Sequence, residues 1–193
     1  MHGVKRERIL RVLLNEPDGK LTKYRVAKEA ESSIGWTMEY LKNLEGMGFV
    51  EKTRVIDPRA LFIYWSEITR APKKFDFFHP DIHQFLLGTK LEYAVTTYQG
   101  ENLVNHYLFP SRIDIYIDKK EYEPWKRYIT GDGLVGKGNV RLLVADEHVF
   151  YHKKRIEQIW VVSMPQLLLD LKREGGVCVE AYEMMVESYV RSG

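Results

Sequence analysis

The fold of the N-terminal third is decided by the stretch Leu41–Glu51, which reads Leu-Lys-Asn-Leu-Glu-Gly-Met-Gly-Phe-Val-Glu. Its two leucines are three residues apart, as they are on the buried side of a helix. Two glycines then interrupt this period, and glycine readily takes the left-handed conformation that ends a helix. A strand-like run, Phe49–Val55, follows directly. The stretch therefore predicts a helix that turns sharply into a strand.

The helix that ends at these glycines is expected to begin at Ser32 or Ser33, because a serine hydroxyl can accept from the free amide groups of a first turn. Apolar residues then recur every three or four positions, at Ile34, Met38, Leu41 and Leu44. We expect these four side chains to face inward. The outward face would then carry Ser33, Gly35, Trp36, Thr37, Glu39, Tyr40 and Asn43.

Two further helices are predicted upstream. Residues 4–15 combine regularly spaced apolar positions with a basic outer face, and Pro17-Asp18-Gly19 ends this helix. Thr22 can cap a shorter second helix that continues to Ala30. The first 46 residues therefore read as three consecutive helices.

A β-hairpin is predicted after the third helix. Phe49–Val55 and Leu61–Trp65 would be its strands, and Ile56–Ala60 its turn. The order of three helices and a hairpin, with the helix end at Leu41–Glu51, resembles a winged helix-turn-helix. That resemblance implies a domain over residues 1–70 that binds double-stranded DNA. Some winged helices bind protein instead, and this alternative stays open.

In helix-turn-helix docking, the N-terminal part of the motif's second helix contacts base edges, while basic groups nearby hold phosphates. Four side chains of the expected outward face would enter the major groove: Ser33, Trp36, Thr37 and Tyr40. Seven cations are candidates for phosphate contacts: Lys5, Arg6, Lys23, Lys42, Lys52, Arg54 and Arg59. Trp36 could instead be a packing residue and Tyr40 a dimer contact, and each cation could be a solvated surface charge.

The net charge of the chain is compatible with DNA binding but is too small to indicate it by itself. The net charge is +2, and the residues up to Arg70 hold 13 Lys and Arg against 10 Asp and Glu. The remaining residues hold 16 against 17, so the two parts carry +3 and −1. Because the excess is modest, one copy would bind DNA only moderately, and we expect the second domain to dimerise or orient two copies.

Other protein classes are disfavoured by composition. No apolar run approaches the ~20 residues that cross a bilayer, and the first residues lack the pattern of a signal peptide. We therefore expect a cytoplasmic protein without a membrane partner. Cys178 is the only cysteine, so neither an intramolecular disulfide nor a cysteine-cluster zinc site can form, and its valine neighbours indicate a buried thiol.

A second domain is predicted over residues 81–193, after a connector at 71–80 that contains two prolines. Its segments alternate between strands and helices, which is typical of an α/β domain with a mixed sheet. The expected strands lie at 93–97, 112–118, 140–144 and 159–162, and the expected helices at 81–88, 99–106, 121–129, 165–172 and 179–191.

Two stretches of this second domain carry a family resemblance. The first is Tyr93–Ile117, which ends in Pro-Ser-Arg-Ile-Asp-Ile-Tyr-Ile, and the second is Val162–Lys172, followed by Gly175-Gly176 and Glu180-Ala181. Both resemble the C-terminal domain of AbiE-type antitoxins, the transcriptional regulators of type IV toxin-antitoxin systems. The resemblance implies an autoregulating antitoxin that binds inverted repeats, a degenerate nucleotidyltransferase-like second domain, and a functional link to a nucleotidyltransferase toxin.

An active nucleotidyltransferase would need a Gly-Ser turn for the triphosphate and two carboxylates spaced Asp-x-Asp/Glu for metal ions. The turn here reads Thr96–Gly100 without Gly-Ser, and Tyr116 stands two residues after Asp114. Asp118 would lie about 13 Å along the strand at ~3.3 Å per residue, too far to share a metal closely. We therefore expect no enzyme, no cofactor and no metal, with Asp114 bonded to Arg112 or to nearby backbone.

Two alternative functions stay open at this point. One is a winged-helix regulator whose second domain holds a small effector in a pocket. The other is an active, metal-dependent nucleotidyltransferase tethered to DNA.

Overall fold

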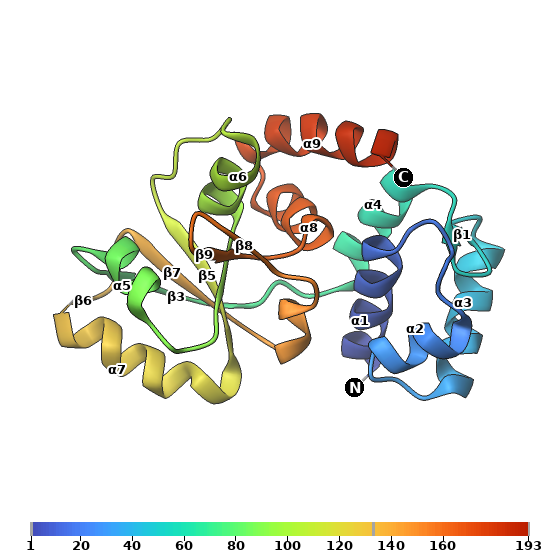
Figure 1. Ribbon diagram of the computed structural model, residues 1–193, viewed down its shortest axis with the longest axis horizontal. Helices are drawn as coiled ribbons and strands as arrows, with labels where there is room; N and C mark the ends of the chain where they lie inside the picture. The colour runs from blue at the N-terminus through green and yellow to red at the C-terminus, as the bar shows by residue number, and fades with distance from the viewer. Residues whose placement is uncertain (1, 133, 193) are drawn as a thin grey trace. The chain divides into compact units, whose positions relative to one another are not determined.

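The computed structural model describes residues 2–132 and 134–192, and over these residues the protein is mixed α/β, as predicted (Figure 1). This part of the chain divides into two compact units. The first unit holds the residues up to Arg70, Met164–Arg173 and the residues from Tyr182 onward. The second unit holds Ala71–Ser163 and Glu174–Ala181. Two segments that the sequence analysis placed in the second domain thus pack with the first.

Three helices open the first unit in the described residues: α1 (His2–Asn15), α2 (Lys23–Glu29) and α3 (Ile34–Gly46). The Thr22 hydroxyl accepts a hydrogen bond from the Arg25 amide and so caps α2, as predicted. Gly48, just after α3, has a φ of 78°, the left-handed conformation expected there. The helices bury a shared apolar core that includes Ile9, Leu10, Leu13, Val26, Ala27, Leu41 and Leu44.

A small sheet follows α3. The strands β1 (Val50–Glu51) and β2 (Arg54–Val55) pair antiparallel, and Asp18, between α1 and α2, forms an isolated β-bridge to Arg54. Gly19 makes this close approach possible, since a Cβ there would lie 2.8 Å from the Cβ of Arg54. A segment that precedes α2 is thereby joined to the hairpin that follows α3.

The prediction of a second hairpin strand at Leu61–Trp65 is wrong, because these residues lie inside helix α4 (Pro58–Ile68). The Asp57 carboxylate accepts from the Ala60 amide, at 2.9 Å, and a proline occupies the first turn, which are both signals of a helix start. The buried residues of α4 then follow helical spacing: Leu61, Phe62 and Trp65. The hairpin that exists is shorter and lies within what was expected to be one strand.

Two C-terminal helices contribute to the first unit, α8 (Met164–Glu174) through Arg173 and α9 (Cys178–Ser192) from Tyr182. Arg11 of α1 donates from Nε to Oε1 of Gln166 at 3.0 Å, and the Tyr189 hydroxyl donates to the Leu14 carbonyl. Both bonds tie α1 to segments from the far end of the chain.

The second unit is built on one mixed sheet, which has seven strands in the described residues in the order β6-β3-β7-β5-β4-β9-β8. The pairs β5–β7 and β4–β9 are parallel, and the other neighbours are antiparallel. The strands are β3 (Lys73–Phe78), β4 (Ala94–Thr96), β5 (Ile113–Asp118), β6 (Leu134–Val135), β7 (Val140–Ala145), β8 (Lys154–Ile156) and β9 (Ile159–Val161).

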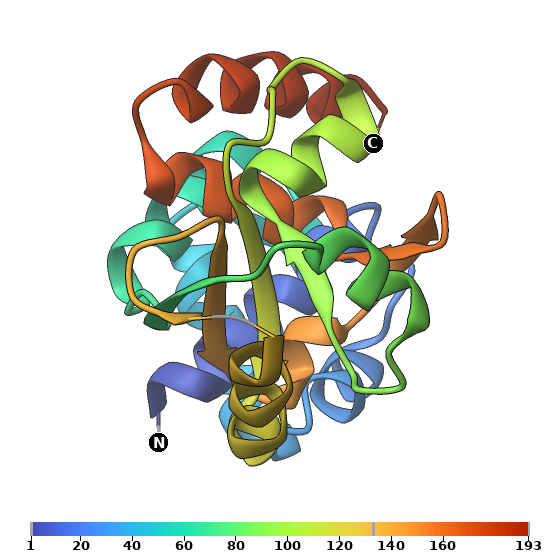
Figure 2. The ribbon, with the colours of Figure 1, turned by 90° about the vertical axis from the view of Figure 1, so that its left-hand side faces the viewer.

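Three α-helices of the described chain accompany this sheet, α5 (Ile82–Gly88), α6 (Thr97–Asn105) and α7 (Tyr122–Asp132), and Figure 2 shows α6 and α7 beside the strands. Two 3-10 turns, η1 (Lys119–Glu121) and η2 (Glu147–Phe150), follow β5 and β7. Alternate residues of the strands join the helices in one apolar core, which includes Phe77, Ile115, Ile117, Leu142, Trp125 and Ile129.

The four strands predicted for this unit are present as β4, β5, β7 and β9, with no end shifted by more than one residue. Strand β3 was not expected, because the prolines at 72 and 80 suggested a connector. These prolines flank the strand instead of interrupting it, and Phe75 and Phe77 alternate with Lys74 and Asp76 between them. Within the described residues, no helix combines the length and the apolar character that a membrane span requires.

Candidate functional site

The outward face of α3 differs from the predicted one. Thr37 and Tyr40 are 0% and 4% exposed, whereas Ile34 and Met38 are 45% and 49% exposed. The prediction that Thr37 and Tyr40 enter a groove is therefore wrong. The buried stripe runs through Thr37, Tyr40, Leu41 and Leu44, so the helix is rotated relative to the orientation expected from its apolar residues alone.

The two other residues predicted to enter the groove, Ser33 and Trp36, differ in their exposure. Ser33 is exposed at the start of α3. Trp36 is half-buried, and its ring stacks on that of Tyr40 with 5.3 Å between centroids. The Arg6 guanidinium lies over the other ring of this pair, 5.8 Å from the Tyr40 centroid. Trp36 is thus engaged in packing, the alternative left open above.

The seven predicted phosphate-binding cations fall into two groups. Arg59 donates to Glu183 at 2.8 Å and lies 3.6 Å from Glu187, and the hydrogen bond with Glu183 raises the pKa of its guanidinium. In the described part of the chain, the other six form no ion pair: Lys5, Arg6, Lys23, Lys42, Lys52 and Arg54. Of these, Lys42, Lys52 and Arg54 are exposed and lie at the end of α3 or on the hairpin.

The hairpin is held close to the end of α3. The Lys52 amide donates to Oε1 of Glu45 at 2.9 Å, and the buried Thr53 hydroxyl donates to the Leu21 carbonyl at 2.7 Å. The exposed face of α3 beside it carries Ser33, Ile34, Gly35, Met38, Glu39, Lys42 and Asn43. A helix is about 10–12 Å wide with its side chains, and the DNA major groove is about 12 Å wide. The width of such a face therefore matches that of the groove.

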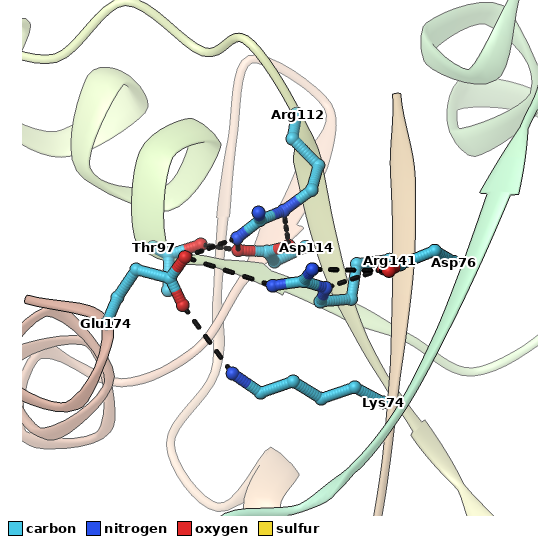
Figure 3. A network of polar contacts seen from close by, with 7 residues as sticks. All are labelled: Lys74, Asp76, Thr97, Arg112, Asp114, Arg141 and Glu174. Carbon is cyan, nitrogen blue, oxygen red and sulfur yellow. Dashed lines mark hydrogen bonds and ion pairs between the residues drawn. The ribbon is translucent and has the colours of Figure 1, made fainter. Parts of the chain in front are cut away.

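The second unit contains a cluster of charged side chains on one face of its sheet (Figure 3). We call it the charged cluster; it comprises Lys74, Asp76, Thr97, Arg112, Asp114, Arg141 and Glu174. The sheet register aligns Asp76 on β3 with Arg141 on β7, and Arg141 with Asp114 on β5. Because directly paired residues project to the same face, the register sets acid, base and acid side by side.

Arg112 is the centre of one half of the charged cluster. Its Nε and Nη2 donate to the two carboxylate oxygens of Asp114 at 2.6 and 2.9 Å, and Nη2 also donates to Glu174 at 2.7 Å. The Thr97 hydroxyl donates to Asp114 as well. The predicted pairing of Asp114 with Arg112 is confirmed, and the carboxylate is 1% exposed.

Arg141 is the centre of the other half. Its Nε and Nη2 donate to Asp76 at 2.6 and 3.3 Å, and its Nη1 lies 3.9 Å from Glu174. The Lys74 ammonium group lies 3.6 Å from the same carboxylate. Three cations thus converge on Glu174, while Asp76 and Asp114 are each held by one arginine.

Two carboxylates of the charged cluster, those of Asp76 and Glu174, favour their ionised forms. The hydrogen bond from Arg141 lowers the pKa of Asp76. Burial opposes the charge of Glu174, but the hydrogen bond with Arg112 and the charges of Lys74 and Arg141 outweigh it, so its pKa is also lowered. The cluster pairs its charges internally, and within residues 2–132 and 134–192 no group of three His, Cys, Asp or Glu side chains is arranged to hold a metal ion.

Two further groups of this unit, Cys178 and Asp118, have structural surroundings. Cys178 is buried, as predicted, and burial raises the pKa of its thiol to about 11, so the reactive thiolate is scarce at neutral pH. Asp118 accepts from the Lys120 amide at 2.6 Å and caps the 3-10 turn that follows β5. Its carboxylate therefore serves the local fold.

A shallow hollow of about 440 Å³ lies elsewhere on the second unit, lined by Gln84, Phe85, Gly88, Thr89, Lys90, Leu91 and Tyr128. Its size falls in the range of small-molecule sites, about 300–1,000 Å³. It is the place where the effector alternative would be sought.

The sequence analysis found Arg112 and Asp114 but missed Lys74, Asp76, Arg141 and Glu174. The strand register brings Asp76 and Arg141 beside Asp114, and Glu174 comes from the C-terminal end of α8. It also missed the exposure of Ile34 and Met38, for which the competing stripe through Thr37, Leu41 and Leu44 was an available signal. Comparisons of the chain with protein-family models, with characterised proteins and with solved structures found no match.

Proposed function

We propose that the protein is a DNA-binding transcriptional regulator whose first unit is a winged helix-turn-helix. The order of its elements supports this: a helix, an extended residue at Asp18, two helices joined by a short turn, and a hairpin to which Asp18 pairs. In this interpretation α2 and α3 form the helix-turn-helix, α3 is the recognition helix and β1–β2 is a short wing.

The observation that carries the proposal is the placement of Lys42, Lys52 and Arg54. These exposed cations, unpaired in the described part of the chain, surround the C-terminal end of α3, next to a helix face free to enter a groove. A phosphate backbone supplies the anions they lack, and each phosphate neutralised releases counterions from the DNA. Because a single unit offers few such cations, two copies bound to an inverted repeat would give the operator affinity.

The antitoxin role is proposed on the resemblance of Tyr93–Ile117 and Val162–Lys172 to AbiE-type antitoxins. The charged cluster agrees with a second domain that acts through assembly or protein contacts. Asp114, on the strand where a nucleotidyltransferase would hold its metal ions, is instead bound by Arg112 and Thr97. The partner in this proposal is a nucleotidyltransferase toxin encoded beside the regulator, and the domain would be nucleotidyltransferase-like in fold and inactive in chemistry.

The test of DNA binding is fluorescence anisotropy with the duplex upstream of the regulator's own gene, against a shuffled duplex of equal length. The affinity for the upstream duplex should be higher, and log K should fall linearly with log salt between about 50 and 200 mM, with a slope of about −0.9 per phosphate contacted. Equal affinities for the two duplexes would contradict a specific regulator. A neighbouring nucleotidyltransferase gene would favour the antitoxin over an orphan regulator.

A further inference from the structure

The exposed face of α3 has an apolar centre. Ile34 and Met38 are 45% and 49% exposed and lie four residues apart, so their side chains are neighbours on one side of the helix. One further turn along the same side stands Lys42, which is exposed. The face therefore reads apolar, apolar, cation from the start of the helix toward the hairpin.

The surroundings of this apolar pair indicate what covers it. Lys42 follows the pair one turn later, and Lys52 and Arg54 lie on the hairpin beyond the C-terminal end of α3. None of the three forms an ion pair in the described residues, so a protein partner that covered this side of the helix and the hairpin would have to supply compensating acids. Duplex DNA supplies phosphates at the rims of the major groove. On its floor, the C5-methyl group of thymine is the apolar group that direct readout uses.

We propose that Ile34 and Met38 contact thymine methyl groups, so that the operator carries A·T pairs at the positions facing the first two turns of α3. This inference rests on the proposed function and adds the bases that are read. Two exposed neighbours could form hydrogen bonds with other bases. Asn43 could bind the edge of adenine, and Glu39 could accept from the amino group of cytosine. Neither of these neighbours can replace a methyl contact.

The test removes single methyl groups from DNA. Short duplexes are first selected from a random pool by the full-length protein, and each thymine of the best duplex is then replaced by uracil. This change leaves base pairing and phosphate charge unaltered. At one or two positions per half-site, uracil should weaken binding about fourfold, the amount expected for one buried methyl group.

The protein variants assign the effect to residues. Ile34→Ala and Met38→Ala should each weaken binding to the thymine duplex and abolish the thymine-to-uracil difference at one position. Ile63→Ala is the matched control, since Ile63 on α4 is likewise 45% exposed, and it should leave both affinities unchanged. Circular dichroism of each variant establishes that the fold is retained.

The outcomes separate this inference from the proposed function. If a selected duplex binds tightly but uracil has no effect at any position, or the effect persists in both variants, the methyl contacts are refuted while DNA binding stands. If the variants instead dissociate a dimer in sedimentation, with no uracil effect, the pair is a contact between copies and the inference fails. If no duplex outperforms the random pool, the proposed function fails with it.

Discussion

Arg11 on α1 donates a hydrogen bond from Nε to Oε1 of Gln166 on α8, at 3.0 Å and across 155 positions of sequence. The arginine is 3% exposed, and its guanidinium also lies 5.6 Å from the ring centroid of Trp65. Gln166 in turn donates to Asp170 at 3.0 Å. The first helix of the chain is therefore bound, through a buried cation, to a helix that follows the entire sheet.

Replacing the acceptor should destabilise the first unit. Gln166→Leu removes the hydrogen bonds with two buried charged groups, Arg11 and Asp170. Each such bond typically contributes about 1.5–3 kcal/mol to the free energy of unfolding, so the loss should be at least this large. Urea unfolding followed by tryptophan fluorescence measures this, since Trp65 is buried in the same unit. The exposed Gln84→Leu should change stability by less than about 0.5 kcal/mol. Equal stability of the two variants would show that the buried hydrogen bonds of Gln166 contribute nothing.

The isolated N-terminal third should fold poorly. A fragment ending at Arg70 lacks α8 and the second half of α9, and so loses the partners of Arg11 and of the Leu14 carbonyl. We expect its helical circular dichroism to be weaker, and its thermal transition broader, than a fragment with native α1–α4 would show. A cooperative transition at the temperature of the full chain would contradict this prediction.

Most of the helices and strands could be predicted from the sequence, but the orientation of the helices and the pairing of the strands could not. Helix ends were recoverable because caps and glycines act locally, as Thr22 and Gly48 do. The orientation of α3 could not be recovered from its apolar residues, because threonine and tyrosine side chains can occupy the buried side of a helix in place of isoleucine and methionine. The Asp57-Pro58 helix start was overlooked in favour of the apolar run after it, although an aspartate followed by proline is itself a strong signal.

The charged cluster was the least predictable feature. Arg112 and Asp114 are two residues apart, so their pairing could be expected from sequence. Asp76 and Arg141 join them because β3 and β5 flank β7 in one register, and Glu174 joins them from the C-terminal end of α8. The order of residues along the chain does not reveal which strands will pair or in which register.

The charged cluster should make stability depend on acid pH. The pKa values of Asp76 and Glu174 are lowered in the folded protein, from ordinary values of 3.8 and 4.5. Groups of this kind stabilise the fold fully above their unfolded pKa, and the contribution is lost as pH falls through the folded one. The free energy of unfolding should therefore decline as the pH is lowered below about 4.5.

The matched variant for this pH dependence is Asp76→Asn, which keeps the shape of the side chain and removes its titration. Urea unfolding at several pH values should show a smaller decline for this variant than for the wild-type protein. The exposed Asp81→Asn is not suitable, because Asp81 caps α5, whereas Glu157→Gln in the β8–β9 turn is a fair control. Parallel pH profiles for Asp76→Asn and the wild type would assign the acid sensitivity elsewhere.

Nucleotidyl transfer should be absent even with magnesium present. Both oxygens of Asp114 accept hydrogen bonds from Arg112, and the Thr97 hydroxyl donates to one of them, so this carboxylate is poorly placed to ligate a metal ion. Incubation with labelled nucleoside triphosphates and RNA should give no incorporation. Magnesium-dependent incorporation that disappears in Asp114→Asn, with an unchanged melting temperature, would restore the enzyme alternative.

Arg54 and Arg59 should differ in their effects on DNA binding although both were predicted to contact phosphates. Arg54 is exposed on the hairpin and forms no ion pair in the described residues, whereas Arg59 is held by Glu183 and Glu187. Arg54→Ala should weaken binding to all duplexes alike and reduce the salt slope by about 1 per copy. Arg59→Ala should change neither, because its charge is already compensated within the protein. Anisotropy titrations at several salt concentrations distinguish the two, and equal losses would mean that the acidic residues of α9 release Arg59 when DNA binds.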